Sequence, residues 1–149
     1  MLFQHFFWFY SHPAVYVLVL PVFGIFSELF PVYARKPLFG YRFVAIASFG
    51  ITFLSLIVWA HHMFYTGTPN WMRHIFMFTT MLIAVPTGVK VFAWLGTLWQ
   101  GNLRLNTPML FCLGGLFNFI FAGITGVMLA TVPIDCLLYT SDAADDGLC

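Results

Sequence analysis

The chain has 149 residues, of which 61% are hydrophobic, 20% aromatic and only 7% charged. A soluble domain carries roughly 25% charged and 45–50% apolar residues. The composition therefore excludes a soluble globular domain, a disordered chain and a nucleic-acid-binding protein, and predicts a polytopic membrane protein in a lipid bilayer. The formal net charge of +1 is unevenly distributed, because residues 1–134 hold six basic residues and one acid, Glu28.

Four segments have the length and hydrophobicity of transmembrane helices, which need about 20 mainly apolar residues. They cover roughly residues 3–30, 41–65, 71–99 and 107–131. Glycine, proline and charged residues separate them, and none shows the alternation over about 10 residues that is typical of barrel strands. The sequence predicts an all-α, polytopic membrane protein with four transmembrane helices, in a membrane domain of residues 1–135.

Basic residues in the loops predict the orientation. The first and third loops lie on the same side of the membrane and hold Arg35, Lys36, Arg42 and Arg104, whereas the second loop holds only Arg73. The positive-inside rule then places the first and third loops in the cytoplasm or its organellar equivalent, and both chain ends outside.

Three histidines lie near the outer ends of the first two segments. His12 is about nine residues into its segment, and His61 and His62 are about four residues from the end of theirs. At 1.5 Å per residue these depths differ by only about 7 Å, so the three imidazoles can share one level. Imidazole suits copper, zinc, iron and nickel, and three ligands leave a position open for a substrate. Alternatively, the adjacent pair binds lipid headgroups and His12 is simply packed.

Two further side chains are candidates for proton transfer. Tyr16 follows His12 at a spacing of four residues, so its phenol can meet the imidazole and offer a proton and an electron close to a metal. The same spacing also serves ordinary packing. Other polar side chains at the span edges, His5 and His74, are explained by contact with water.

Lys90 is the only basic residue well inside a segment, about nine residues from the predicted cytoplasmic end. With Thr80, Thr87 and Thr97 it falls on one helical stripe, which favours a hydrated proton path toward the level of Tyr16. The alternative is a lysine that reaches the membrane surface, with threonine hydroxyls bonded to their own helix.

Several motifs together resemble the catalytic subunit I of haem–copper terminal oxidases. Residues 4–16 (QHFFWFYSHPAVY) resemble the sixth helix of that family, residues 59–64 (WAHHMF) the seventh and residues 83–92 (IAVPTGVKVF) the eighth. The last segment, with residues 123–126 (GITG), resembles the ninth. The resemblance covers about residues 2–135, and three motifs in the same order and spacing make it specific.

The resemblance implies a set of site residues. His12, His61 and His62 would bind the copper of a binuclear centre, and Tyr16 would be cross-linked to His12 and supply an electron and a proton to dioxygen. The oxygen site would be walled by Trp8, Val15 and Trp59.

The resemblance also implies two proton routes. Thr87 and Lys90 would belong to the lysine pathway. In many members a glutamate directly follows the His-Pro pair and ends a second pathway, but here Ala14 stands in that position. The preceding Tyr10 and Ser11 resemble the subgroup in which a Tyr-Ser pair replaces this carboxylate. A retained Tyr16 argues against the nitric oxide reductase branch.

The implied activity is the reduction of dioxygen to water coupled to proton translocation. It would require copper, haem, the other oxidase subunits (II and III) and an electron donor, cytochrome c or quinol. We expect the chain to be an internal fragment with four of about twelve helices, inactive alone, with the haem ligands elsewhere. The implied location is a bacterial cytoplasmic membrane or the mitochondrial inner membrane. The alternative, from another class, is a small four-helix membrane protein that binds or transports metal.

The stretch from about Cys136 departs from the family pattern. Residues 136–149 are polar and acidic and contain no histidine. They resemble the translation of a sequencing adapter, so we expect a non-native tail without function and without ordered packing.

Overall fold

The computed structural model describes residues 2–134, and within them every regular element is a helix. In chain order these are α1 (Leu2–Ala34), α2 (Tyr41–Ser55), the short 3₁₀ helix η1 (Trp59–Met63), α3 (Asn70–Leu82), α4 (Ala84–Leu98) and α5 (Thr107–Leu129). The prediction of an all-α membrane protein is confirmed. The predicted tail lies outside the described residues.

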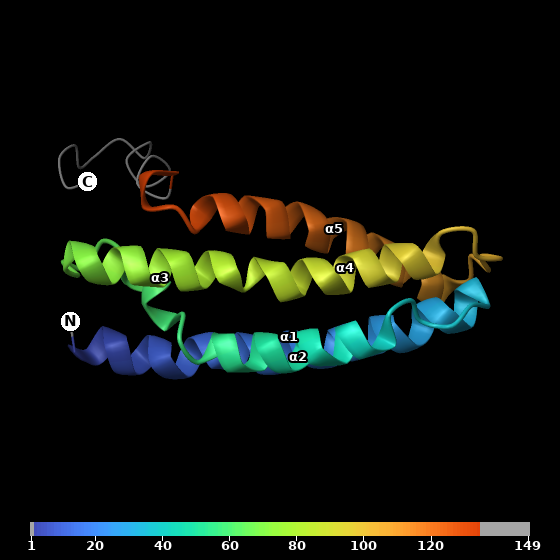
Figure 1. The fold of residues 1–149 in the computed structure, drawn as a ribbon, viewed down its shortest axis with the longest axis horizontal. Helices are drawn as coiled ribbons and strands as arrows, with labels where there is room; N and C mark the ends of the chain where they lie inside the picture. Colours follow the sequence, from blue (N-terminus) through green and yellow to red (C-terminus); the bar gives the residue numbers. More distant parts are fainter. Residues whose placement is uncertain (1, 135–149) are drawn as a thin grey trace.

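The helices form an antiparallel bundle (Figure 1). α3 and α4 follow each other as one rod, so the chain crosses the length of the bundle four times and returns each time through a short connection. α1 contacts α2, α4 and α5, and α2 packs along α4. The N-terminus, η1 and the end of α5 lie at one end of the bundle, and residues 35–40 and 99–106 connect helices at the other (Figure 1).

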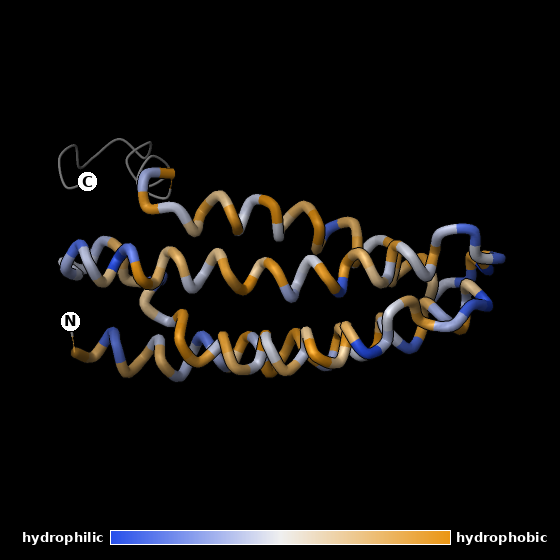
Figure 2. The backbone as a smooth tube through the Cα atoms, viewed as in Figure 1, coloured by the Kyte–Doolittle hydropathy of each residue, from blue (hydrophilic) through white to orange (hydrophobic). Residues whose placement is uncertain are grey.

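Three helical segments are long and apolar enough to cross a membrane: Leu2–Ala34, Asn70–Leu98 and Thr107–Leu129. The remaining apolar helix, α2, has 15 residues. Large apolar side chains cover the outside of the bundle, for example Phe49 (79% exposed) and Phe111 (77% exposed). Figure 2 shows that hydrophilic residues gather mostly toward the two ends. A bilayer accounts for this distribution, because its core is as apolar as these side chains.

The second predicted segment differs in outline from the structure. A helix over residues 41–65 was expected, but α2 ends at Ser55, and Leu56 and Ile57 donate to carbonyls only three residues back. Val58, fully buried, has φ −119° and ψ 1°, which is not helical. The neighbouring β-branched residues Ile57 and Val58 have low helix propensity. Burial of Val58 then fixes the break, and η1 starts in a new direction.

The bundle end with the basic loops is tied together by backbone atoms. Nζ of Lys36 donates to the carbonyl oxygens of Gly96 (3.2 Å) and Trp99 (2.8 Å), where α4 ends. A cation at a helix C-terminus satisfies free carbonyls and complements the helix dipole. The amide of Arg104 donates to the carbonyl of Tyr33 at 2.9 Å. The first and third loops therefore share one end, as the sequence predicts.

The larger of the two buried clusters lies in the half of the bundle nearer these loops. Its buried side chains come from α1, α2, α4 and α5 and the residue between α3 and α4: Phe23, Phe26, Phe30, Ile51, Ile83, Trp94, Met109, Cys112 and Leu116. The indole N–H of Trp94 donates to Ser27 Oγ at 3.0 Å, which joins α4 to α1 inside this core.

Close packing of α5 on α1 depends on Gly115. A Cβ atom on Gly115 would lie 2.8 Å from Cζ of Phe26, whereas a Cβ on Gly114 would meet nothing within 4 Å. We expect Gly115→Ala to destabilise the bundle by about 1–3 kcal/mol through overpacking, and Gly114→Ala to leave it unchanged or slightly more stable. Unfolding of the chain in detergent micelles measures both, and equal stability of the two variants would contradict this packing.

Candidate metal centre

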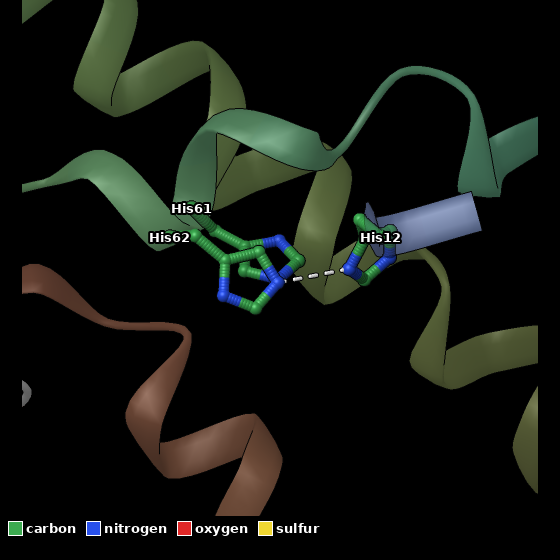
Figure 3. A group of neighbouring side chains, drawn as sticks. All are labelled: His12, His61 and His62. Carbon is green, nitrogen blue, oxygen red and sulfur yellow. Dashed lines mark hydrogen bonds between the residues drawn. The ribbon is translucent and has the colours of Figure 1, made fainter. Parts of the chain in front are cut away.

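Three histidine side chains converge at the bundle end that carries η1 (Figure 3). His12 comes from α1, while His61 and His62 come from η1. Their candidate ligand nitrogens all lie within 4.8 Å of one another. Nδ1 of His12 and Nε2 of His62 are 3.1 Å apart, and the ring centroids of His61 and His62 are 4.3 Å apart.

The break after α2 produces this convergence. Val58 is not helical, and η1, which follows it, carries His61 and His62 as its third and fourth residues. The ring centroids of His61 and His62 are 4.3 Å apart, and both rings face His12 across the gap to α1 (Figure 3). The matched depth expected from the sequence therefore leads to actual contact between the three rings.

The donor set fits a metal ion. Nitrogens that share one ion at roughly 2 Å each lie no more than about 4 Å apart, and the widest separation here exceeds that limit by less than one ångström. Nδ1 of His12 and Nε2 of His62, at 3.1 Å, have the separation expected of two nitrogens on one ion. The other ring nitrogen of His12, Nε2, is buried and has no hydrogen-bond partner within the described residues. Imidazole donors suit copper.

Thr80 of α3 fixes the orientation of His61, a role that the sequence analysis missed. Its hydroxyl donates to the carbonyl of Phe76 at 2.6 Å, so the only hydroxyl proton is in use. Its Oγ1 lies 3.1 Å from Nδ1 of His61 and must accept the proton of that nitrogen. The Nδ1–H tautomer leaves Nε2 of His61 with a lone pair for a metal. The sequence did offer one sign of this role, because Thr80 is a polar residue within an apolar segment that packs beside the histidines.

Tyr16 lies beside the histidines, as predicted. Its ring centroid is 4.6 Å from that of His12, with the planes inclined by 60°. Tyr16, His12 and His61 line one cleft of about 450 Å³ between α1, η1, α3, α4 and α5. Thr80 and Thr87 line it as well, and its remaining walls are apolar side chains and glycines of the last three helices.

The three predicted wall residues lie in different places. Trp8 stacks on His62 with ring centroids 3.8 Å apart and planes 7° apart. Trp59 begins η1 and packs edge-on against Phe76, with centroids 4.9 Å apart. Val15 is 52% exposed on α1. Two of the three thus contact the histidines or their turn, and none lines the cleft.

The predicted proton-path residues are also separated. Lys90 is buried, and its Nζ lies 4.9 Å from the centroid of Phe23 rather than in the cleft. Thr87 lines the cleft and donates to the carbonyl of Ile83 at 2.8 Å. Tyr10 is 75% exposed and Ser11 is half-buried, both on α1 before His12.

The tautomer of His61 is testable without metal. Thr80→Val removes the acceptor of its Nδ1–H, and a hydrogen bond of about 1 kcal/mol corresponds to roughly a fivefold change in the tautomer ratio. Nitrogen NMR shifts of labelled histidine in detergent-solubilised chain measure this ratio. Thr80→Ser keeps the hydroxyl and should behave as the unmodified chain. An unchanged ratio in Thr80→Val would show that Thr80 does not hold the ring.

Comparisons with known proteins assign the chain to a family. The profile of the family described as "Cytochrome C and Quinol oxidase polypeptide I" matches residues 1–143. Cytochrome c oxidase subunit 1 of Synechocystis sp. is 62% identical to the chain over 135 residues, and those of Thermostichus vulcanus and Corynebacterium diphtheriae are each 55% identical. Each alignment covers 91% of the chain.

The chain spans about a quarter (24%) of the length of these relatives. The alignments cover 135 residues, whereas the family profile extends to residue 143, so the predicted boundary at Cys136 stays a prediction. The bacterial sources support a bacterial membrane as the location. The chain belongs to the cytochrome c and quinol oxidase polypeptide I family.

Proposed function

We propose that the chain is part of the catalytic subunit of a respiratory terminal oxidase, which reduces dioxygen to water at a haem–copper centre coupled to proton translocation. The carrying observation is the convergence of three imidazoles beside Tyr16 in a chain of this family. The activity belongs to the full-length subunit. A small four-helix metal-binding or transport protein is not favoured, because relatives at 53–62% identity are named as oxidase subunits four times as long.

His12, His61 and His62 would hold the copper, since they supply three neutral nitrogen donors on two elements. The haem would need ligands from other parts of the subunit. Together the two metals would supply dioxygen with a binding site and with electrons. The chain's own contribution would be to carry the three imidazoles and to orient two of them, through Thr80 for His61 and Trp8 for His62.

Tyr16 would supply a proton and an electron to the reacting oxygen. Its ring lies against His12 and it lines the cleft, and both observations support this role. The cleft volume of about 450 Å³ is within the range of ordinary small-molecule sites. Trp8, Val15 and Trp59 would then limit the space around the histidines.

Lys90 and Thr87 would bring protons from the cytoplasmic side to Tyr16. Lys90 faces Phe23, which follows Tyr16 by seven residues on the same face of α1. Seven residues of helix correspond to about 10 Å. Thr87 and Tyr16 line the same cleft, which supports a route past Thr87.

Tyr10 and Ser11 would relay protons in a second route, in place of the carboxylate that is absent at Ala14. Their position on α1, one turn or less before His12, supports this role. Other oxidase subunits, of the type of subunits II and III, and cytochrome c or quinol as electron donor would complete the enzyme in its membrane.

Removal of one histidine tests the copper assignment. In the full-length oxidase, His61→Ala should abolish copper binding at this site, because only two of the three converging imidazole ligands remain. Metal analysis of the purified, membrane-inserted enzyme measures copper relative to haem. His74→Ala, on α3 at the same end of the bundle, is the control and should keep full copper. Full copper content in His61→Ala would refute the assignment.

Removal of the buried lysine tests the proton route. Lys90→Met should slow reduction of the haem–copper centre about 100-fold, since positioned proton-transfer groups contribute 10²–10⁴-fold. Stopped-flow absorbance of the haem measures the rate. Lys36→Met removes a cation at the loop end of the bundle and should leave this rate unchanged in assembled enzyme. An unaltered rate in Lys90→Met would show that Lys90 is only structural.

A further inference from the structure

His5 makes a specific contact that simple exposure to water does not explain. It is half-buried near the start of α1, and its Nδ1 accepts the indole N–H of Trp59 at 3.4 Å. An indole nitrogen can only donate, so Nδ1 of His5 must be the acceptor and its proton lies on Nε2. The bond joins residues that are 54 positions apart in the chain.

The same face of α1 makes a second contact with Trp59. Phe9 follows His5 by four residues and therefore lies on the same side of the helix. Its ring meets the indole edge-on, with centroids 5.2 Å apart. Trp59 is thus fixed by one polar and one aromatic contact to α1.

Further along the same face of α1, two side chains contact the histidines of η1. Trp8 and His12 follow His5 by three and seven residues, which places them on the same stripe. Trp8 stacks on His62, and His12 lies within hydrogen-bond distance of it. One stripe of α1 therefore contacts both the first residue of η1 and the histidine three positions later.

Contacts with its two neighbours, α1 and α3, must set the position of η1. A 3₁₀ helix of five residues has poor hydrogen-bond geometry and little stability of its own. It has no side-chain cap, and it is preceded by the non-helical Val58. Trp59, as its first residue, joins the start of the turn to α1 through His5 and Phe9.

We propose that His5 is a positioning residue, which holds η1 through Trp59 at the height where His61 and His62 meet His12. The inference rests on the proposed copper site and adds to it a residue that touches none of the ligands. Loss of the hydrogen bond lets the turn shift along α1, so the ligand geometry becomes heterogeneous.

The test uses the full-length oxidase with four variants. His5→Leu removes the acceptor, Trp59→Phe removes the donor and keeps the aromatic packing, and a double variant combines them. His5→Asn keeps an acceptor oxygen close to the position of Nδ1. His74→Leu is the control, because His74 is exposed at the same bundle end and its Nδ1 lies 2.7 Å from the carbonyl oxygen of Asn70 in its own helix.

Two measurements report the geometry and affinity of the copper site rather than the amount of enzyme that assembles. One is the infrared band of carbon monoxide that moves to copper after photolysis from the haem. The other is copper retention against a copper(I) chelator. We expect His5→Leu to broaden and shift the band and to weaken retention about tenfold, the lower end for hydrogen-bonded neighbours of metal ligands. His5→Asn and His74→Leu should match the unmodified enzyme.

The double variant should equal either single variant, since both remove one interaction. A band and copper retention identical to the unmodified enzyme in His5→Leu would overturn the positioning role. If His5→Leu does not assemble, an unchanged band in Trp59→Phe overturns it instead. Unmodified enzyme without copper at the three histidines would overturn the proposed function itself.

Discussion

The candidate metal centre depends on how one short 3₁₀ turn sits against α1. η1 has five residues, and its buried members, Ala60 (2% exposed) and Met63 (fully buried), anchor it to the bundle. The ring contacts of Trp59 and His62 with α1 then set its register. Because His61 and His62 are carried on this turn, a shift of the turn by one residue would separate them from His12.

The sequence was sufficient to predict what hydrophobicity and charge control. Long apolar segments gave the helices, and the loops with Arg35, Lys36 and Arg104 do share one end of the bundle. The depth of the histidines followed from residue counting. The end of α2 at Ser55 did not, because no glycine or proline marks it. Burial of Val58 and the contacts of η1 with α1 decide it, and both are tertiary interactions between residues far apart in sequence.

The threonine stripe shows a similar limit. Periodicity placed Thr80, Thr87 and Thr97 on one face, but not the partners of their hydroxyls. Each donates to the carbonyl four residues back. Thr80 also accepts from His61, and Thr97 accepts the amide N–H of Phe39 at 2.9 Å. Three threonines on one stripe therefore differ in what they do: Thr80 orients His61, Thr87 lines the cleft and Thr97 binds the loop at Phe39. A proton could pass Thr87 only if its hydroxyl rotates away from Ile83.

The two ends of the bundle are held by different kinds of contact. At the loop end, backbone amides and Lys36 join α1 to the end of α4. At the site end, α1 and η1 meet mainly through rings: indole on imidazole, and imidazole on imidazole. Backbone bonds tolerate changes of side chain, whereas the ring contacts do not.

An ion bound by His12, His61 and His62 would add a link between α1 and η1 at the end where backbone links are fewer. Since the three nitrogens converge only in the folded chain, ion binding and folding of this end would be coupled, and the ion would stabilise the arrangement that binds it. Nδ1 of His12 and Nε2 of His62 are 3.1 Å apart, close to the separation of two nitrogens on one ion, so such an ion would join α1 directly to η1.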